Sequence, residues 1–237
     1  MKLRRLAMDS PLAEPRTART EKGWSPEAPE IAFGVWRRRC VSIAGGAPVE
    51  AQTVVWLQTR RYFADLRLPL PGFAKRLPPA AFSGRALWRL PKVVFERDMD
   101  SAPVAVADAA LLRFEGNGQR LIESGFTQLG GRSLSYTEAW AREPLGLGDS
   151  CVLEATGRRH ARLLVLADHA LLLVAGNGGC VTRATHFRRT PIGWRSGGAL
   201  GRRLPPPPPN PLVLAAPQIA DAHRFWTGRR WTQRDGA

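Results

Sequence analysis

The sequence has few of the residues that build disulfide frameworks and metal sites. It contains three cysteines and four histidines in 237 residues. Cys40, Cys151 and Cys180 cannot all pair within the chain, none lies in a C-x-x-C motif, and none has a histidine at ligand spacing. We therefore expect free thiols in a reducing compartment, and we expect neither a metal nor a cofactor.

Long apolar runs and a secretory signal are also missing. The longest apolar run, residues 161–176, is interrupted by Arg162, Asp168 and His169, and it is too short to span a bilayer. The basic residues near the start are not followed by an apolar segment of the kind that a signal peptide needs. These absences predict a soluble cytoplasmic protein that does not act in a membrane.

Lysine is scarce, although the chain is strongly basic. Four of the 35 basic residues are lysine, so arginine carries nearly all of the formal net charge of +15. Basic residues exceed acidic ones by 1 in residues 1–30, by 10 in 31–195 and by 4 in 196–237, so no single segment holds the charge. Two explanations stay open: the arginine-rich, alanine-rich composition of a GC-rich coding sequence, or a basic face that binds an anionic partner.

Composition divides the chain into three parts. Residues 1–30 are polar and contain four prolines, which predicts a disordered arm. Residues 31–195 hold nearly all of the patterned apolar sequence and are predicted to form one β-barrel domain. Residues 196–237 begin with glycines and the five prolines Pro205 to Pro209, which predicts a proline-rich linker and a largely disordered tail.

The apolar period within residues 31–195 is two, which indicates strands. No run of ten or more residues has a helical apolar stripe with proper caps. Asn117-Gly118 and Asn177-Gly178 are dipeptides that favour tight hairpin turns. We predict an all-β fold, an antiparallel lipocalin-like barrel, with twelve strands at 33–43, 52–59, 62–68, 82–88, 92–97, 109–115, 120–123, 134–142, 150–156, 162–166, 171–175 and 181–187.

One strand face combines large rings with charged groups. In the segment 134–142, alternation places Tyr136, Glu138, Trp140 and Arg142 on the same side. Rings of this size belong in an interior, and a carboxylate placed among them is costly unless it is paired. We expect Arg142, or Arg67 from an earlier strand, to supply the partner of Glu138.

Other strands repeat this mixture of apolar and polar side chains. Asp65 and Arg67 share a face beside Phe63, Trp56 shares a face with Gln58, and Glu123 shares a face with Leu121. Two interpretations remain: a structural network at a barrel rim, with Asp65–Arg67 and Glu138–Arg142 as lateral pairs, or the lining of a ligand pocket.

These residues also carry a family resemblance. The segments W-L-Q-T, Y-F-A-D-L-R-L-P, L-I-E-S-G and Y-T-E-A-W-A-R occur in this order within residues 33–190. The chain thereby resembles a family of bacterial and fungal lipocalin-like proteins, whose fungal members are associated with a casein-kinase-type protein kinase and whose bacterial members are mostly of unknown function. The resemblance implies a fold and no catalytic residues. The matching positions are Trp56, Gln58, Asp65, Arg67, Glu123, Tyr136, Glu138, Trp140 and Arg142. The sequence departs from the family pattern at residues 96–108.

The sequence favours a non-enzymatic binding protein that holds a small amphipathic or anionic ligand inside the barrel. In this hypothesis Trp56, Tyr136 and Trp140 line the pocket, and Arg67 and Arg142 meet an anionic group. Glu123 and Glu138 would orient the arginines, and Gln58 and Asp65 complete the candidate site.

The alternative is a protein–protein adaptor with a filled barrel, which docks an acidic partner through its arginine-rich face or its C-terminal tail. Nucleic-acid binding is less favoured, because the aromatic residues are expected to point inward and not to alternate with arginines on an exposed face.

Overall fold

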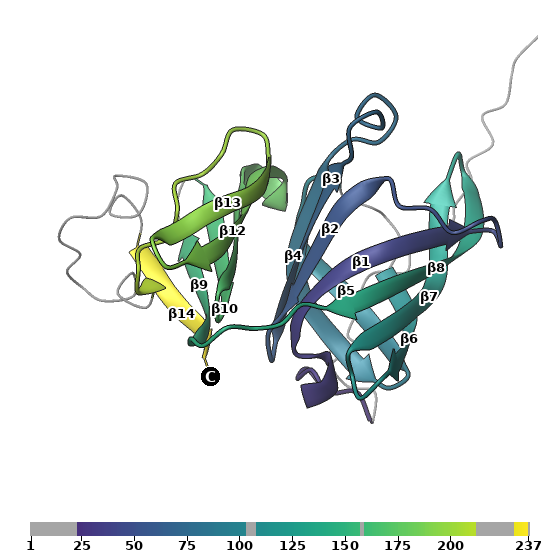
Figure 1. The fold of residues 1–237 in the computed structure, drawn as a ribbon, viewed down its shortest axis with the longest axis horizontal. Coiled ribbons are helices and arrows are strands. Elements are labelled where there is room, and N and C mark those ends of the chain that lie inside the picture. The colour runs from purple at the N-terminus through teal and green to yellow at the C-terminus, as the bar shows by residue number, and fades with distance from the viewer. Residues whose placement is uncertain (1–22, 103–107, 157–158, 212–229, 237) are drawn as a thin grey trace, which may run out of the picture.

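The computed structural model describes residues 23–102, 108–156, 159–211 and 230–236. The fold is all-β, as predicted, and the first part of the chain forms a closed antiparallel barrel of eight strands in sequence order (Figure 1). β1 pairs with both β2 and β8, which closes the barrel. The strands are β1 (Gly34–Ile43), β2 (Gln52–Gln58), β3 (Tyr62–Pro69), β4 (Ala80–Arg89), β5 (Lys92–Asp100), β6 (Asp108–Glu115), β7 (Arg120–Leu129) and β8 (Arg132–Arg142).

The later strands form a second, six-stranded antiparallel sheet in the order β13-β12-β11-β10-β9-β14. Figure 1 shows this sheet beside the barrel, with β3 and β4 on the side of the barrel that faces it. Its strands are β9 (Ser150–Thr156), β10 (His160–Leu166), β11 (His169–Ala175), β12 (Val181–Thr190), β13 (Gly193–Leu200) and β14 (Arg230–Gly236), and two short 3-10 helices, η2 (Glu30–Ala32) and η3 (Asn177–Gly179), complete the described elements.

The structure has three apolar layers. The first fills the closed half of the barrel and includes Trp36 and Trp88. The second joins the outer face of the barrel, with Leu57 and Leu66, to the second sheet, with Leu171. The third covers the far face of the second sheet. β11 is buried at all seven positions, because it lies between two apolar layers.

An ion network around the buried Arg162 also joins the barrel to the second sheet. Arg162 of β10 is 1% exposed, and its guanidinium donates to Asp98 of β5 at 2.6 and 2.7 Å and to Ser83 of β4 at 3.1 Å. The same group donates to Glu154 of β9 at 2.8 Å. Hydrogen bonds from one arginine to three strands hold the two sheets in a fixed relation.

The predicted domain boundaries are wrong. The barrel ends at Arg142, not at residue 195, because its eight strands already close and the later strands pair only among themselves. The predicted disordered tail contains the end of β13 and all of β14, which pairs with β9 and buries Trp231. Residues 212–229 lie outside the described residues.

The N-terminal arm is also ordered from residue 23 onward. Ser25 exchanges two backbone hydrogen bonds with Trp88, and the carbonyl of Ala32 accepts a hydrogen bond from the Trp36 indole at 2.9 Å. This segment therefore covers one end of the barrel, at the bottom of Figure 1. The predicted disorder of residues 1–22 concerns positions outside the described residues.

The predicted strands are found, and the turns are close to those expected. All twelve predicted segments overlap β1 to β12. Asn117 and Gly118 both have positive φ, as the hairpin prediction requires. In the second turn the positive φ values fall on Gly178 and Gly179, within η3, and not on Asn177. β5 also continues through residues 96–100, where the sequence departs from the family pattern.

Candidate functional site

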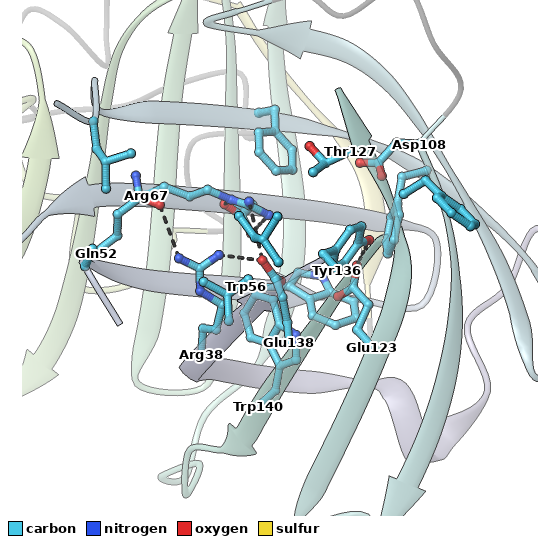
Figure 2. Close-up of a pocket in the computed structure, with 18 of the residues that line it drawn as sticks. Arg38, Gln52, Trp56, Arg67, Asp108, Glu123, Thr127, Tyr136, Glu138 and Trp140 are labelled. Carbon is cyan, nitrogen blue, oxygen red and sulfur yellow. Dashed lines mark hydrogen bonds and ion pairs between the residues drawn. The ribbon is translucent and has the colours of Figure 1, made fainter. Parts of the chain in front are cut away.

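The end of the barrel opposite η2 contains an open cavity of about 410 Å³ (Figure 2). All eight barrel strands contribute side chains to its wall, and the β1–β2 and β3–β4 connections contribute Val49 and Leu77. A barrel of eight strands is wide enough to hold one small ligand when its interior is not filled by side chains. Small-molecule sites usually occupy roughly 300–1,000 Å³, so this cavity is within the usual range.

The floor of the cavity is aromatic. Trp56 of β2 lies edge-on to Trp140 of β8 at 5.6 Å between ring centroids, and edge-on to Phe95 of β5 at 5.8 Å. Phe63 of β3 contacts Phe95 at 5.0 Å. These residues come from four strands and point inward by the alternation of each strand, and the edge-to-face geometry is the arrangement that aromatic pairs prefer.

Above this floor, Arg38 connects three polar side chains. Arg38 of β1 is 6% exposed and donates to Glu138 of β8 at 2.5 Å. It also donates to the two carboxylate oxygens of Glu50 at 2.9 and 3.1 Å, and to the side-chain carbonyl of Gln52 at 3.2 Å. Burial by itself lowers the pKa of Arg38, but Glu50 and Glu138 outweigh this and raise it, so the guanidinium stays charged.

Two further arginines of the wall are also paired. Arg67 donates to Asp65 at 2.9 Å, and its guanidinium lies 3.9 Å from Glu138. Arg97 donates to Asp100 at 3.1 Å and to Asp108, and it stacks over the ring of Phe82 at 3.6 Å.

Glu123 of β7 is bonded differently. Its carboxylate accepts a hydrogen bond from the Tyr136 hydroxyl at 2.8 Å, and it lies directly opposite Glu138 in the β7–β8 register. Burial raises the pKa of Glu123 to about 8, and the charge of Glu138 contributes to this shift, while the hydrogen bond from Tyr136 opposes it. Like charges directly opposite on adjacent strands repel, so a protonated Glu123 relieves the pair near neutral pH.

Several buried polar atoms of the wall lack a hydrogen-bond partner among the described residues. They are the Oε2 atom of Glu138, the indole nitrogens of Trp56 and Trp140, and the Nε atom of Arg97. A buried group left in this state costs about 1–3 kcal/mol. All four side chains line the cavity, and a polar group without a partner in the protein can bond to a molecule held beside it.

Comparison with known proteins finds a similar fold but does not identify a function. No protein-family model and no curated protein matches the chain. The structure is similar to the crystal structure of the uncharacterized protein YLR301w from Saccharomyces cerevisiae, with a TM-score of 0.62 and 14% sequence identity. The similarity covers 86% of this chain and 98% of that one.

Seven of the nine candidate residues from the sequence line the cavity: Trp56, Asp65, Arg67, Glu123, Tyr136, Glu138 and Trp140. Gln58 and Arg142 also belong to inward-facing rows, but they lie at the closed end. The Gln58 amide donates to the carbonyls of Thr59 and Tyr62, and Arg142 donates to the carbonyl of Ile31. The expected Glu138–Arg142 pair is therefore wrong, because the two side chains lie at different depths in the barrel.

The sequence reasoning missed Arg38, the main partner of Glu138. A signal for it exists, because Arg38 is two positions after Trp36 and strand alternation places both inside. Arg97 and Asp108 were missed because the segment 96–108 departs from the family pattern. Among the residues that the structure describes, no group of three or more acidic, cysteine or histidine side chains could hold a metal ion. In the same part of the chain, no helix has the length and apolar character needed to cross a membrane.

Proposed function

We propose that this protein is a non-enzymatic binding protein that holds a small amphipathic ligand inside its eight-stranded barrel. The observation that carries the proposal is the open cavity of about 410 Å³, which has an aromatic floor and a polar wall with unpartnered buried atoms. The apolar part of the ligand would contact Trp56 and Phe95, and its polar part would bond to the wall near Glu138.

The wall gives less support to an anionic ligand, which the sequence had made an option. Arg67 is bonded to Asp65, and Arg142 lies outside the cavity and stacks on Trp36. An arginine that is already paired offers less to a ligand anion, because the anion has to compete with a carboxylate held in place.

The adaptor alternative also has less support. It required a filled barrel, whereas the barrel contains a cavity. One of its two possible docking surfaces was a free C-terminal tail, whereas β14 is paired with β9 and Trp231 is buried.

A fluorescent apolar probe tests the proposal. N-phenyl-1-naphthylamine is neutral and gains fluorescence in apolar sites, so the purified full chain should bind it with saturable fluorescence. Thr127 lines the mouth of the cavity, and Thr127→Trp should weaken this binding at least about tenfold by filling the mouth.

The neighbouring Gln128 is exposed and does not line the cavity, so Gln128→Trp is the matched control. It should bind the probe like the natural chain, and urea unfolding should show that both variants are folded. Saturable binding that is insensitive to Thr127→Trp, or the absence of saturable binding, would contradict the proposed function.

A further inference from the structure

The wall of the cavity contains more acidic than basic side chains. Three arginines line it, Arg38, Arg67 and Arg97, and each is already bonded to at least one carboxylate. Four carboxylates line the cavity, those of Asp65, Asp108, Glu123 and Glu138, while Glu50 and Asp100 do not line it but bond to Arg38 and Arg97. A cavity whose wall has this excess attracts cations and disfavours anions.

Two of these carboxylates line the cavity and keep unused bonding capacity. Among the described residues, Glu123 forms no ion pair, and the Tyr136 hydroxyl donates to its Oε1 atom. Glu138 is 4% exposed, and its Oε2 atom has no partner within the described chain. Figure 2 shows the Glu138 side chain between Arg38 on one side and Tyr136 and Glu123 on the other.

The surrounding rings favour a cation as well. Trp56, Trp140, Phe63 and Phe95 line the same cavity, below the carboxylates. The face of an aromatic ring carries negative potential, and rings gathered around a pocket are a common way to bind organic ammonium groups. An acidic wall above an aromatic floor suits a ligand with a positively charged nitrogen on an apolar body.

The charge state of Glu123 agrees with this geometry. Burial, Glu138 and Asp108 raise the pKa of Glu123, while the Tyr136 hydrogen bond and Arg67 lower it. A positive charge placed beside Glu123 would favour its ionised form. A cation bound where Glu123 and Glu138 face each other would therefore balance the charge of the wall.

Resting on the proposed function, we propose that the ligand is an organic cation, a small amphipathic amine. Its ammonium group donates to Glu123 and to the free oxygen of Glu138, and its apolar body lies against Trp56 and Phe95. The amine supplies the direct ion-pair partner that Glu123 lacks among the described residues, since the nearby Arg67 is bonded to Asp65.

The test is competition by three probes that share one apolar body. 2-Naphthylmethylamine, 2-naphthylmethanol and 2-naphthoate would each be titrated against N-phenyl-1-naphthylamine bound to the full chain at pH 7. We expect the amine to displace the reporter at a concentration about tenfold lower than the alcohol, and the carboxylate to be the weakest.

Glu123→Gln should remove most of the preference for the amine over the alcohol. Glu96→Gln, at an exposed position of β5, is the control and should keep the preference. Displacement by the carboxylate at the same or lower concentration than by the amine would overturn the amine inference, and so would a preference that survives Glu123→Gln. In either case binding of the reporter, blocked by Thr127→Trp, would still support the proposed function. Absence of reporter binding would overturn both.

Discussion

Replacing Glu123 by glutamine should change how the stability of the protein depends on pH. The pKa of Glu123 is about 8 in the folded chain, against an ordinary value of 4.5. Between these two values the folded protein keeps the proton and the unfolded chain releases it. The free energy of unfolding therefore falls as pH rises through this window, by at most about 1.4 kcal/mol per pH unit.

The total effect follows from the width of the window. The full shift corresponds to roughly 5 kcal/mol. The cavity is open to water, which reduces the penalty of ionisation, so we expect about half of this value. Glutamine stays neutral at every pH and can still accept the hydrogen bond from Tyr136. Glu123→Gln should therefore match the natural chain near pH 5 and exceed its stability by about 2–3 kcal/mol at pH 8.5.

Urea unfolding followed by tryptophan fluorescence at several pH values between 5 and 8.5 measures this difference. His169 and His186 have lowered pKa values because they are buried, so they add a slope of the opposite sign below about pH 6.5. That slope is common to both proteins and cancels when they are compared. Glu96→Gln should follow the natural chain. If the curves of the natural chain and Glu123→Gln are parallel throughout, Glu123 is ionised in the folded state and the electrostatic reasoning fails.

Two further results are expected. Arg38→Met should lower the free energy of unfolding, measured by urea denaturation, by about 3–5 kcal/mol, because it leaves the buried Glu138 without its main partner. Adding Glu138→Gln should recover part of this loss. A decrease below about 1 kcal/mol would show that the ion pair contributes little to stability. The exposed Cys180 should react with a chromogenic disulfide reagent in the native protein. Cys151 should react only after unfolding, because it is 2% exposed and burial raises its pKa to about 12. Rapid labelling of Cys151 in the native protein, detected by peptide mapping, would contradict this expectation.

The alternation of apolar and polar residues was sufficient to locate β1 to β12, but not to assign them to sheets. Period two identifies strands and does not identify their partners, so the second sheet was included in the barrel. One signal of the second sheet is present in the sequence. β10 and β11 are nearly continuous apolar runs and not alternating ones, which indicates burial on both faces. β13 contains three glycines in eight residues, which is not the composition of a typical strand. β14 follows a proline-rich segment, and its sequence R-W-T-Q-R-D-G contains few strand-forming residues.

The sequence predicted which side chains of each strand point inward better than it predicted which side chains of different strands meet. Alternation gave the inward face of each strand, and seven of nine residues line the cavity. Depth along the barrel axis depends on the stagger between strands, which the sequence does not provide. This is why Arg142 was expected beside Glu138 and lies instead over Trp36 at the closed end. Because the stagger is not known from the sequence, the contact between Arg38 and Glu138, which are 100 residues apart, was not predicted either.

The two halves of the barrel interior use polar groups for different purposes. At the closed end, Trp36, Gln58 and Arg142 donate to backbone carbonyls and so complete the end of the barrel. At the open end, the polar side chains of the wall bond mainly to one another, and carboxylates outnumber arginines. Apolar residues of similar volume could fill a barrel of this width with equal or greater stability. A buried acidic wall beside open space is therefore unfavourable for the fold alone, and a bound cation would offset this cost.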